Sequence, residues 1–349
     1  MRHFLRTGFL LGLIFCLTGG APAWAQTAKT PAKAPAPPAT PAGKAVAGDL
    51  FSMLPPSDLI ATVDAGRLIN DLLPKIAGFS AMGVDKLAKD IADFTQKTGV
   101  DPTKLQNVVA GFSLNNGQAQ GVVLVQGIDP TAKQVEALMQ ALKGEYKTSE
   151  YKGKTLYNLI ANVKAPAAGP VSVKTDEMAL ATLGNLTVAF GDLPSVKKVI
   201  DMQASGEKSG LSPAMVAAIG ETRSSALVRF ALNIPEALRT EATEQGDLFK
   251  SVATIKLVLG TFDVASDLSL SLDTLLRTGS QNEAGELENG LKGLVSLVRG
   301  IFAGGDPATD VFAKLFDQIK IGSKAADVSL SIGIPRALMD ELGKKKEPK

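Results

Sequence analysis

Apolar and polar positions repeat one pattern along the chain: a short apolar strand, one to three small or polar residues, then a proline at the start of an amphipathic helix. Proline suits a first helical turn because its ring presets φ, and the N–H that it lacks has no helical partner there. A weaker copy lies at residues 59–64, before a helix predicted at 67–76. The four clear copies end at Pro130, Pro194, Pro235 and Pro335.

Between these junctions, pairs of apolar segments flank residues that are typical of tight turns. Residues 108–114 and 121–126 flank Asn115-Asn116-Gly117, and residues 178–183 and 186–190 flank Gly184-Asn185. Asn and Gly adopt the positive φ angles that short hairpin turns require. Both pairs therefore predict antiparallel hairpins.

A longer strand pair is predicted at residues 254–262 and 268–276. In the second strand, leucines at 268, 270 and 272 alternate with polar residues, so one face should lie on a core and the other in water. The helix predicted at 282–302 has an apolar stripe that suits packing across this sheet. The stripe consists of Leu287, Leu291, Leu294, Val298 and Ile301.

Each half of the chain follows the order strand, helix, hairpin, helix, hairpin, helix. The halves are residues 49–221 and 222–343, and the junction at residues 234–241 matches the one at 334–341 in sequence. The prediction is an α+β fold of tandem duplicated units, built from antiparallel hairpins with helices packed on one face.

Residues 1–25 have the pattern of a secretory signal peptide, with a basic start, an apolar run at 8–17 and an Ala-x-Ala cleavage site that ends at Ala25. The apolar run is shorter than the roughly 20 residues that span a bilayer. Bulky Phe15 directly before Cys16 argues against a lipoprotein signal. We expect cleavage after Ala25, a periplasmic or secreted protein, and no integral membrane segment.

The two ends of the mature chain are expected to be extended. Residues 26–48 are rich in Ala, Pro and Lys without apolar periodicity, which predicts a disordered linker, and residues 344–349 form a basic tail. Cleavage also removes the only cysteine, histidine and tryptophan. Without imidazole or thiol groups, the common nucleophile systems and His/Cys metal sites are excluded. We therefore expect no enzyme, no cofactor and no metal.

The charge balance argues against a nucleic-acid partner. Nine of the 37 Lys and Arg residues but only one of the 35 Asp and Glu residues lie outside 49–343, which leaves 28 basic against 34 acidic residues in the body. Proteins that bind the phosphate backbone need a positive surface. No nucleic-acid partner is expected.

All three tyrosines lie between residues 146 and 157, interleaved with lysines. Aromatic rings beside ammonium groups bind sugars, peptides and anions. The alternative is cross-strand packing along a two-stranded ribbon. The partner is unknown from sequence, with an envelope protein, a peptide or a glycan as the candidates. The candidate binding residues are Tyr146, Tyr151, Lys152, Lys154 and Tyr157.

Ser195 and Lys198 match the Ser-x-x-Lys spacing of penicillin-binding enzymes and β-lactamases. The Lys-Thr-Gly triplet at 97–99 precedes the serine instead of following it, and Ser-Asp-Asn is absent. A serine hydrolase therefore ranks third among the functional hypotheses, and no catalytic residue is assigned.

Three segments, at residues 54–64, 151–157 and 186–211, resemble a family of exported bacterial proteins that carry a domain of unknown function. The likeness covers mainly residues 54–219 and rests on turn sequences such as Leu54-Pro55-Pro56-Ser57-Asp58. It implies an envelope or secreted location and brings no catalytic residue or ligand. The first hypothesis is thus a non-enzymatic binding or structural module of the envelope.

The second hypothesis is a carrier of an apolar ligand, held between a sheet and the helix at 282–302. Glycines in that helix lower its stability, and they leave room for a ligand or permit close helix-to-sheet packing. These glycines are Gly285, Gly290, Gly293 and Gly300.

Overall fold

The computed structural model describes residues 48–343 except for gaps at 80–82, 116–117, 142–144, 161–171, 174–177, 208, 245–246 and 303–313. The expected signal peptide, linker up to residue 47, and basic tail lie outside the described residues. The described chain divides into two compact units, at residues 48–77 with 83–216 and at 217–343 with 78–79. The division falls inside helix α8 (Pro213–Glu221). The sequence predicted it at the end of this helix, between residues 221 and 222.

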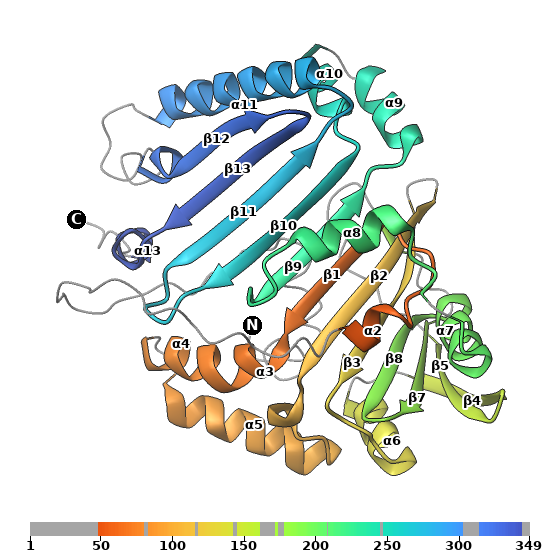
Figure 1. Ribbon diagram of the computed structural model, residues 1–349. Helices are drawn as coiled ribbons and strands as arrows, with labels where there is room; N and C mark the ends of the chain where they lie inside the picture. The colour runs from red at the N-terminus through yellow and green to blue at the C-terminus, as the bar shows by residue number, and fades with distance from the viewer. Residues whose placement is uncertain are drawn as a thin grey trace. The chain divides into compact units, whose positions relative to one another are not determined.

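Unit 1 contains an antiparallel sheet with the strand order β1-β2-β3-β8-β7-β5-β4 (Figure 1). A short strand, β6, pairs in parallel with β3. Its strands are β1 (Leu59–Asp64), β2 (Asn107–Asn115), β3 (Gln118–Gln126), β4 (Glu145–Tyr151), β5 (Lys154–Ile160), β6 (Ser172–Val173), β7 (Met178–Gly184) and β8 (Thr187–Asp192). Its helices are α2 (Gly48–Phe51), α3 (Ala65–Arg67), a π-helical turn (Leu68–Leu72), α4 (Leu73–Phe79), α5 (Val84–Thr98), a 3₁₀ turn (Pro102–Lys104), α6 (Ala132–Ala141) and α7 (Leu193–Ser205).

Unit 2 contains an antiparallel sheet with the strand order β9-β10-β11-β13-β12. Its strands are β9 (Val228–Asn233), β10 (Leu257–Val264), β11 (Leu270–Arg277), β12 (Ile319–Lys324) and β13 (Asp327–Ile334). Its helices are α9 (Glu236–Glu244), α10 (Asp247–Ala253), α11 (Gln281–Phe302) and α13 (Arg336–Gly343).

Both units have the same order of elements. A single strand and its helices precede a hairpin, a further helix follows, and the last hairpin inserts its second strand beside the first hairpin: β8 pairs with β3, and β13 pairs with β11. Unit 1 differs by the additional β4–β5 hairpin at the end of its sheet. The predicted α+β class with antiparallel hairpins is confirmed. The tandem duplication stays a prediction, and unit 1 has one hairpin more than the predicted order.

The strand-to-helix junctions follow the predicted local chemistry. Pro194 is the second residue of α7, and the carboxylate of Asp192 accepts the backbone N–H of Ser195 at 2.9 Å, which caps the helix. Pro235 and Pro335 directly precede α9 and α13. The apolar run before each proline forms the strand, as the sequence predicts.

The turn between β7 and β8 is strained at a leucine. Asn185 and Leu186 have φ angles of 52° and 57°, a region that costs an L-residue with a Cβ atom about 1–2 kcal/mol. Because Leu186 is 50% exposed, its side chain contributes little to the core. We expect Leu186→Gly to raise the free energy of unfolding by about 0.5–1 kcal/mol in urea titrations. Leu186→Ala, which keeps the Cβ atom, should give no gain, and an equal gain from both variants would contradict this explanation.

Candidate functional site

The β4–β5 hairpin places Tyr146 and Tyr157 on one face of its ribbon and Tyr151 on the other. Tyr157 lies opposite Thr148, and Thr148 is two residues from Tyr146 on β4. Tyr146 and Tyr157 therefore share one face of the ribbon. Their rings are 6.0 Å apart and inclined at 55°. Tyr157 is only 4% exposed and packs in a cluster with residues of α6, β7 and β8, while Tyr146 packs against the edge of that cluster. These two rings contribute to the core of unit 1.

Tyr151 lies on the other face of the ribbon, where it contacts α7. Its hydroxyl donates to the carboxylate of Asp201 at 2.9 and 3.1 Å, and Lys152 Nζ lies 2.6 Å from the same carboxylate. These hydrogen bonds raise the pKa of both Tyr151 and Lys152, and the bond from Lys152 is the largest cause of the lowered pKa of Asp201. Asp201 therefore fixes the tip of the hairpin on the helix.

Two ammonium groups lie near the ring of Tyr151. Lys197 Nζ is 5.3 Å and Lys152 Nζ 5.9 Å from the ring centroid, both within the range of cation–π attraction. Lys154 instead donates to the carbonyl oxygen of Leu183 at 2.8 Å. The surface part of the ribbon is thus a compact ionic cluster at Tyr151, and its binding role stays a prediction.

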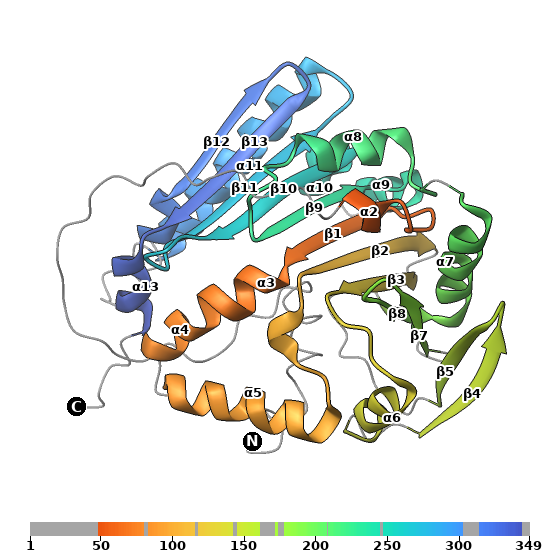
Figure 2. The same ribbon diagram turned by 60° about the horizontal axis from the view of Figure 1, so that its bottom comes forward.

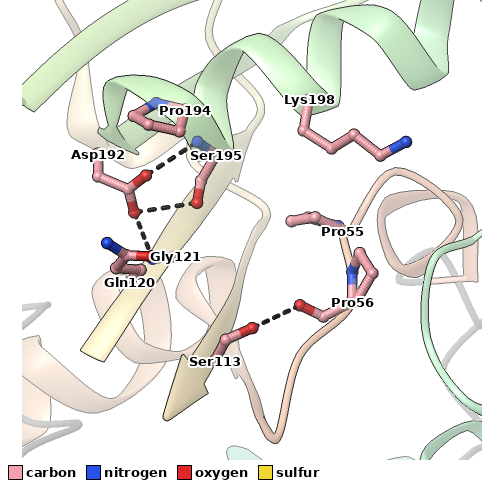
Figure 3. A pocket seen from close by; sticks show the side chains of 9 residues that line it. All are labelled: Pro55, Pro56, Ser113, Gln120, Gly121, Asp192, Pro194, Ser195 and Lys198. Carbon is pink, nitrogen blue, oxygen red and sulfur yellow. Dashed lines mark hydrogen bonds between the residues drawn. The ribbon is translucent and has the colours of Figure 1, made fainter. Parts of the chain in front are cut away.

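A shallow pocket of about 190 Å³ lies in unit 1 at the start of α7 (Figure 3). One carboxylate organises it: Asp192 accepts hydrogen bonds from the backbone N–H of Gly121 at 2.5 Å and from the Ser195 hydroxyl at 2.9 Å. The pocket is lined by Pro55, Pro56, Ser113, Gln120, Gly121, Asp192, Pro194, Ser195 and Lys198.

Ser195 and Lys198, the two residues of the serine-hydrolase hypothesis, both line the pocket, but each has another partner: Asp192 for the hydroxyl and Glu207 for the ammonium. Lys198 points away from Ser195 in Figure 3, and its Nζ lies 3.4 Å from the carboxylate of Glu207. Activation of a serine needs a base within hydrogen-bond reach. Gly99 of the Lys-Thr-Gly triplet ends α5 with a φ of 70°, which is a helix-capping role. The observed arrangement does not provide the serine–lysine contact of that chemistry.

The sheet of unit 2 has one continuous apolar face. Cross-strand partners share a face, and Val258, Leu276 and Val328 are such partners on β10, β11 and β13. Residues two positions apart on a strand also share a face, and those on this face are mainly apolar in all five strands. Ser329, Ser331 and Asp273 lie on the opposite face. The apolar set is Val228, Phe230, Leu232, Val258, Phe262, Val264, Leu270, Leu272, Leu276, Ile319, Ile321, Val328, Leu330, Ile332 and Ile334.

Helix α11 covers only part of this apolar face. Figure 2 shows α10 and α11 on one side of the β10–β13 strands. Ala284 and Leu287 of α11 are fully buried in a cluster with Val328. Leu272, Ile332 and most of the other apolar residues of the face are partly exposed. The predicted alternation is present at Leu270 and Leu272 of β11, whereas Leu268 lies before the strand with a φ of 66° and is buried. The apolar side of β11 is only partly buried.

Two leucines in the second half of α11 are exposed, whereas Val295 and Val298 there are half-buried. Leu294 is 41% and Leu297 63% exposed, in contrast to Leu287 at 0%. Three of the four helix glycines, Gly285, Gly293 and Gly300, have no atom within 4 Å of the position that a Cβ would take. These glycines do not serve close packing, which was one of their two predicted roles.

A groove of about 480 Å³ runs between α11 and the edge strand β12. The residues that line it are Lys292, Val295, Ser296, Ile319, Lys320 and Ile321. The period of two puts the side chains of Ile319 and Ile321 on the apolar face and that of Lys320 on the opposite face. This groove was not expected from the sequence. Its signal was the alternation of Ile319, Ile321 and the apolar positions of β13, which marks a second strand pair with one apolar face.

Within the part of the chain that the structure describes, no three His, Cys, Asp or Glu side chains gather as a metal site. No helix of the described residues is both long enough and apolar enough to cross a membrane.

These observations define an α+β protein of two antiparallel units, one of which has a partly open apolar sheet face. No known family model matches the sequence. No curated protein matches it either. Among solved structures, the chain is similar to TP0453 in crystal form III, with 9% identity, a TM-score of 0.45, and coverage of 84% of this chain and 95% of that one. Crystal forms I and IV of TP0453 match with 10% identity and TM-scores of 0.40 and 0.43 over 84% of this chain and 94% of theirs. A likeness this distant says nothing about a ligand or an activity.

Proposed function

We propose that the protein is an exported, non-enzymatic binding protein that carries an apolar ligand on unit 2. The observation that supports this function is the continuous apolar face of the β9–β13 sheet, which α11 covers only in part. Soluble monomers rarely leave large contiguous apolar patches exposed, and such patches commonly mark binding sites. The signal-peptide pattern and the resemblance to exported proteins support the location.

The energetics favour an apolar ligand over a polar one. Burial of apolar surface contributes about 25 cal/mol per Å², so covering about 200 Å² of this face contributes on the order of 5 kcal/mol before the costs of association. Side chains of Phe262, Leu272 and Ile332 offer no hydrogen-bonding group to a polar molecule. A ligand without polar groups along its length fits this surface.

Nile red, an uncharged apolar dye, tests the proposed function through its fluorescence on binding. We expect Leu272→Gln to weaken dye binding at least tenfold, because the amide places a polar group on the apolar face. Ser271→Gln is the matched control, since it lies one position earlier on the opposite face of the same strand. Circular dichroism establishes that both variants are folded. Loss of binding in both, or in neither, contradicts the proposal.

A second candidate function is supported by the ionic cluster at Tyr151. Two ammonium groups near one aromatic ring suit an anionic peptide or glycan, and Lys197 has no hydrogen bond or ion pair among the described residues. This surface continues the first sequence hypothesis, a binding module of the envelope. The double variant Tyr151→Ser, Lys152→Ser tests this surface.

Export itself gives a prediction about the chain's start. Mass spectrometry of the exported protein should find Gln26 at the N-terminus, free or cyclised, because cleavage is expected after Ala25. An acylated Cys16 at the N-terminus would instead establish a lipoprotein and contradict the expected free periplasmic or secreted form.

A further inference from the structure

We propose that the ligand is an uncharged lipid with one linear chain, such as a fatty alcohol, and that this chain crosses the strands of unit 2 beside the exposed leucines of α11. This inference rests on the proposed apolar-ligand function and goes further, because it specifies the ligand's charge, its shape and its position on the sheet.

The β9–β13 sheet has all the charged residues of its strands on one face. The strand register places them opposite the face that contains Val258 and Leu276. These residues are Arg229, Asp263, Asp273, Arg277, Lys320, Lys324 and Asp327. The five strands therefore offer no counter-ion on their apolar face, and a charged group buried there would lose its hydration without compensation.

The charges of α11 that face β12 are already paired. Lys292 Nζ is 2.5 Å from the carboxylate of Glu288, which also accepts the hydroxyl of Ser323 on β12. Further along the helix, Arg299 pairs at 2.9 Å with Asp317, which lies two residues before β12. Both contacts use one flank of the helix, and they leave no cation there for an acidic head group.

The exposed leucines lie on the other flank of α11. At 3.6 residues per turn, Leu297 is about 160° around the helix axis from Arg299, and Leu294 is about 120° from Glu288. Because α11 packs on β12 and β13, the last two strands of the sheet, this second flank faces β11 and β10. Leu294 and Leu297 thus form an apolar wall beside the open part of the sheet face.

One row of apolar side chains crosses the sheet at the level of this wall. Direct cross-strand partners make up the row from β12 to β9: Ile319, Ile332, Leu272, Phe262 and Val228. Ile319 lines the same groove as Val295, which puts the row under the second half of α11. Neighbouring strands are about 4.8 Å apart, so the row extends about 14 Å beyond β13. A straight row beside a wall fits one linear chain.

The head group of such a ligand lies against the wall at Leu297, which is 63% exposed. This position is partly shielded from water by the apolar side chains around it. A hydroxyl or ester group loses less hydration free energy there than a carboxylate or an ammonium group does. The site therefore selects an uncharged head group.

Competition against bound Nile red on the full mature protein tests this assignment. Decanol, decanoate and decyltrimethylammonium have the same chain and differ in charge. We expect decanol to displace the dye at a concentration about tenfold or more below that of either ion, because only the ions lose a charge's hydration.

A lysine added to the wall should reverse the discrimination against the anion. Leu297→Lys should improve displacement by decanoate about tenfold, through a charge-assisted hydrogen bond, and should not improve decanol. Ser296→Lys is the matched control, because this exposed neighbour lines the groove on the β12 side of the helix. It should leave decanoate as weak as in the unmodified protein. Circular dichroism establishes that both variants are folded.

The outcomes separate this proposal from the proposed function. Equal displacement by the three compounds overturns the uncharged assignment and leaves the apolar carrier standing. An equal effect of the two lysine variants on decanoate, including no effect, overturns the position at the wall. Failure of Nile red to bind overturns both proposals.

Two other occupants of the apolar face are also distinguished. Binding of the protein to phosphatidylcholine vesicles, without displacement of the dye by decanol, assigns the face to a membrane surface. A dimer in analytical ultracentrifugation that Leu297→Gln dissociates, again without displacement by decanol, assigns it to a second copy of the chain. Either result overturns the assignment.

Discussion

Replacement of Tyr157 by alanine is expected to lower the free energy of unfolding by about 3–5 kcal/mol, the range for removal of a buried aromatic ring. Tyr157 is 4% exposed and packs in the cluster that joins α6 to β5, β7 and β8. The cavity left by its ring cannot close easily, because strands on both sides of β5 fix the backbone. Urea unfolding followed by circular dichroism measures the loss.

The double variant Tyr151→Ser, Lys152→Ser should behave differently from the Tyr157 variant. Its ion pair is largely exposed, and exposed pairs contribute about 0–1 kcal/mol. We therefore expect nearly unchanged stability and weaker capture of envelope components in a pull-down. If the double variant chiefly lowers the melting temperature, Tyr151 and Lys152 are structural partners of α7, and the binding role of the ribbon fails.

Leu287→Ala is expected to lower the free energy of unfolding by about 2–5 kcal/mol, because the leucine is fully buried between α11 and β13. Leu297→Ala is the matched control on the same helix. Its side chain is 63% exposed, so the expected change is within about 0.5 kcal/mol. Chemical denaturation of both variants compares the two halves of α11.

Equal losses from the two α11 variants would contradict this difference in burial between Leu287 and Leu297. Nile red binding adds a second comparison. Leu297→Ala removes exposed apolar surface of α11 without disturbing the buried cluster, so a change in dye affinity in this variant reports on the exposed surface of the helix and not on folding.

The parts of the fold that depend on local chemistry could be predicted from the sequence. Asp192 and Pro194 specify a helix start through a cap and a preset φ, and both effects act within four residues. The hairpin turn after β7 and the two-residue period of β11 are equally local, although the turn consists of Asn185 and Leu186, one residue later than predicted. For the same reason the helix at 282–302 was expected nearly at its observed bounds.

The candidate sites depend on contacts that no local pattern contains. Asp201 meets Tyr151 from fifty residues away, and nothing near Asp201 in sequence marks it as a partner. The three tyrosines are close in sequence but do not form one surface. Tyr146 and Tyr151 are an odd number of positions apart on β4, so the period of two puts them on opposite faces. How much of an apolar sheet face remains open depends on where a helix lies, which periodicity does not specify.

The outermost strands of the two sheets bear on how the protein avoids aggregation. An edge strand presents unpaired backbone groups to which strands of other molecules can add. β4 ends the sheet of unit 1 and β12 that of unit 2, and charged side chains interrupt both: Glu145, Lys147 and Glu150 on β4, and Lys320 and Lys324 on β12. Addition of a foreign strand would bury these charges or place them against its side chains. Lys320 then protects this edge against strand addition, and Lys320→Gln should make the protein more prone to form fibrils at high concentration.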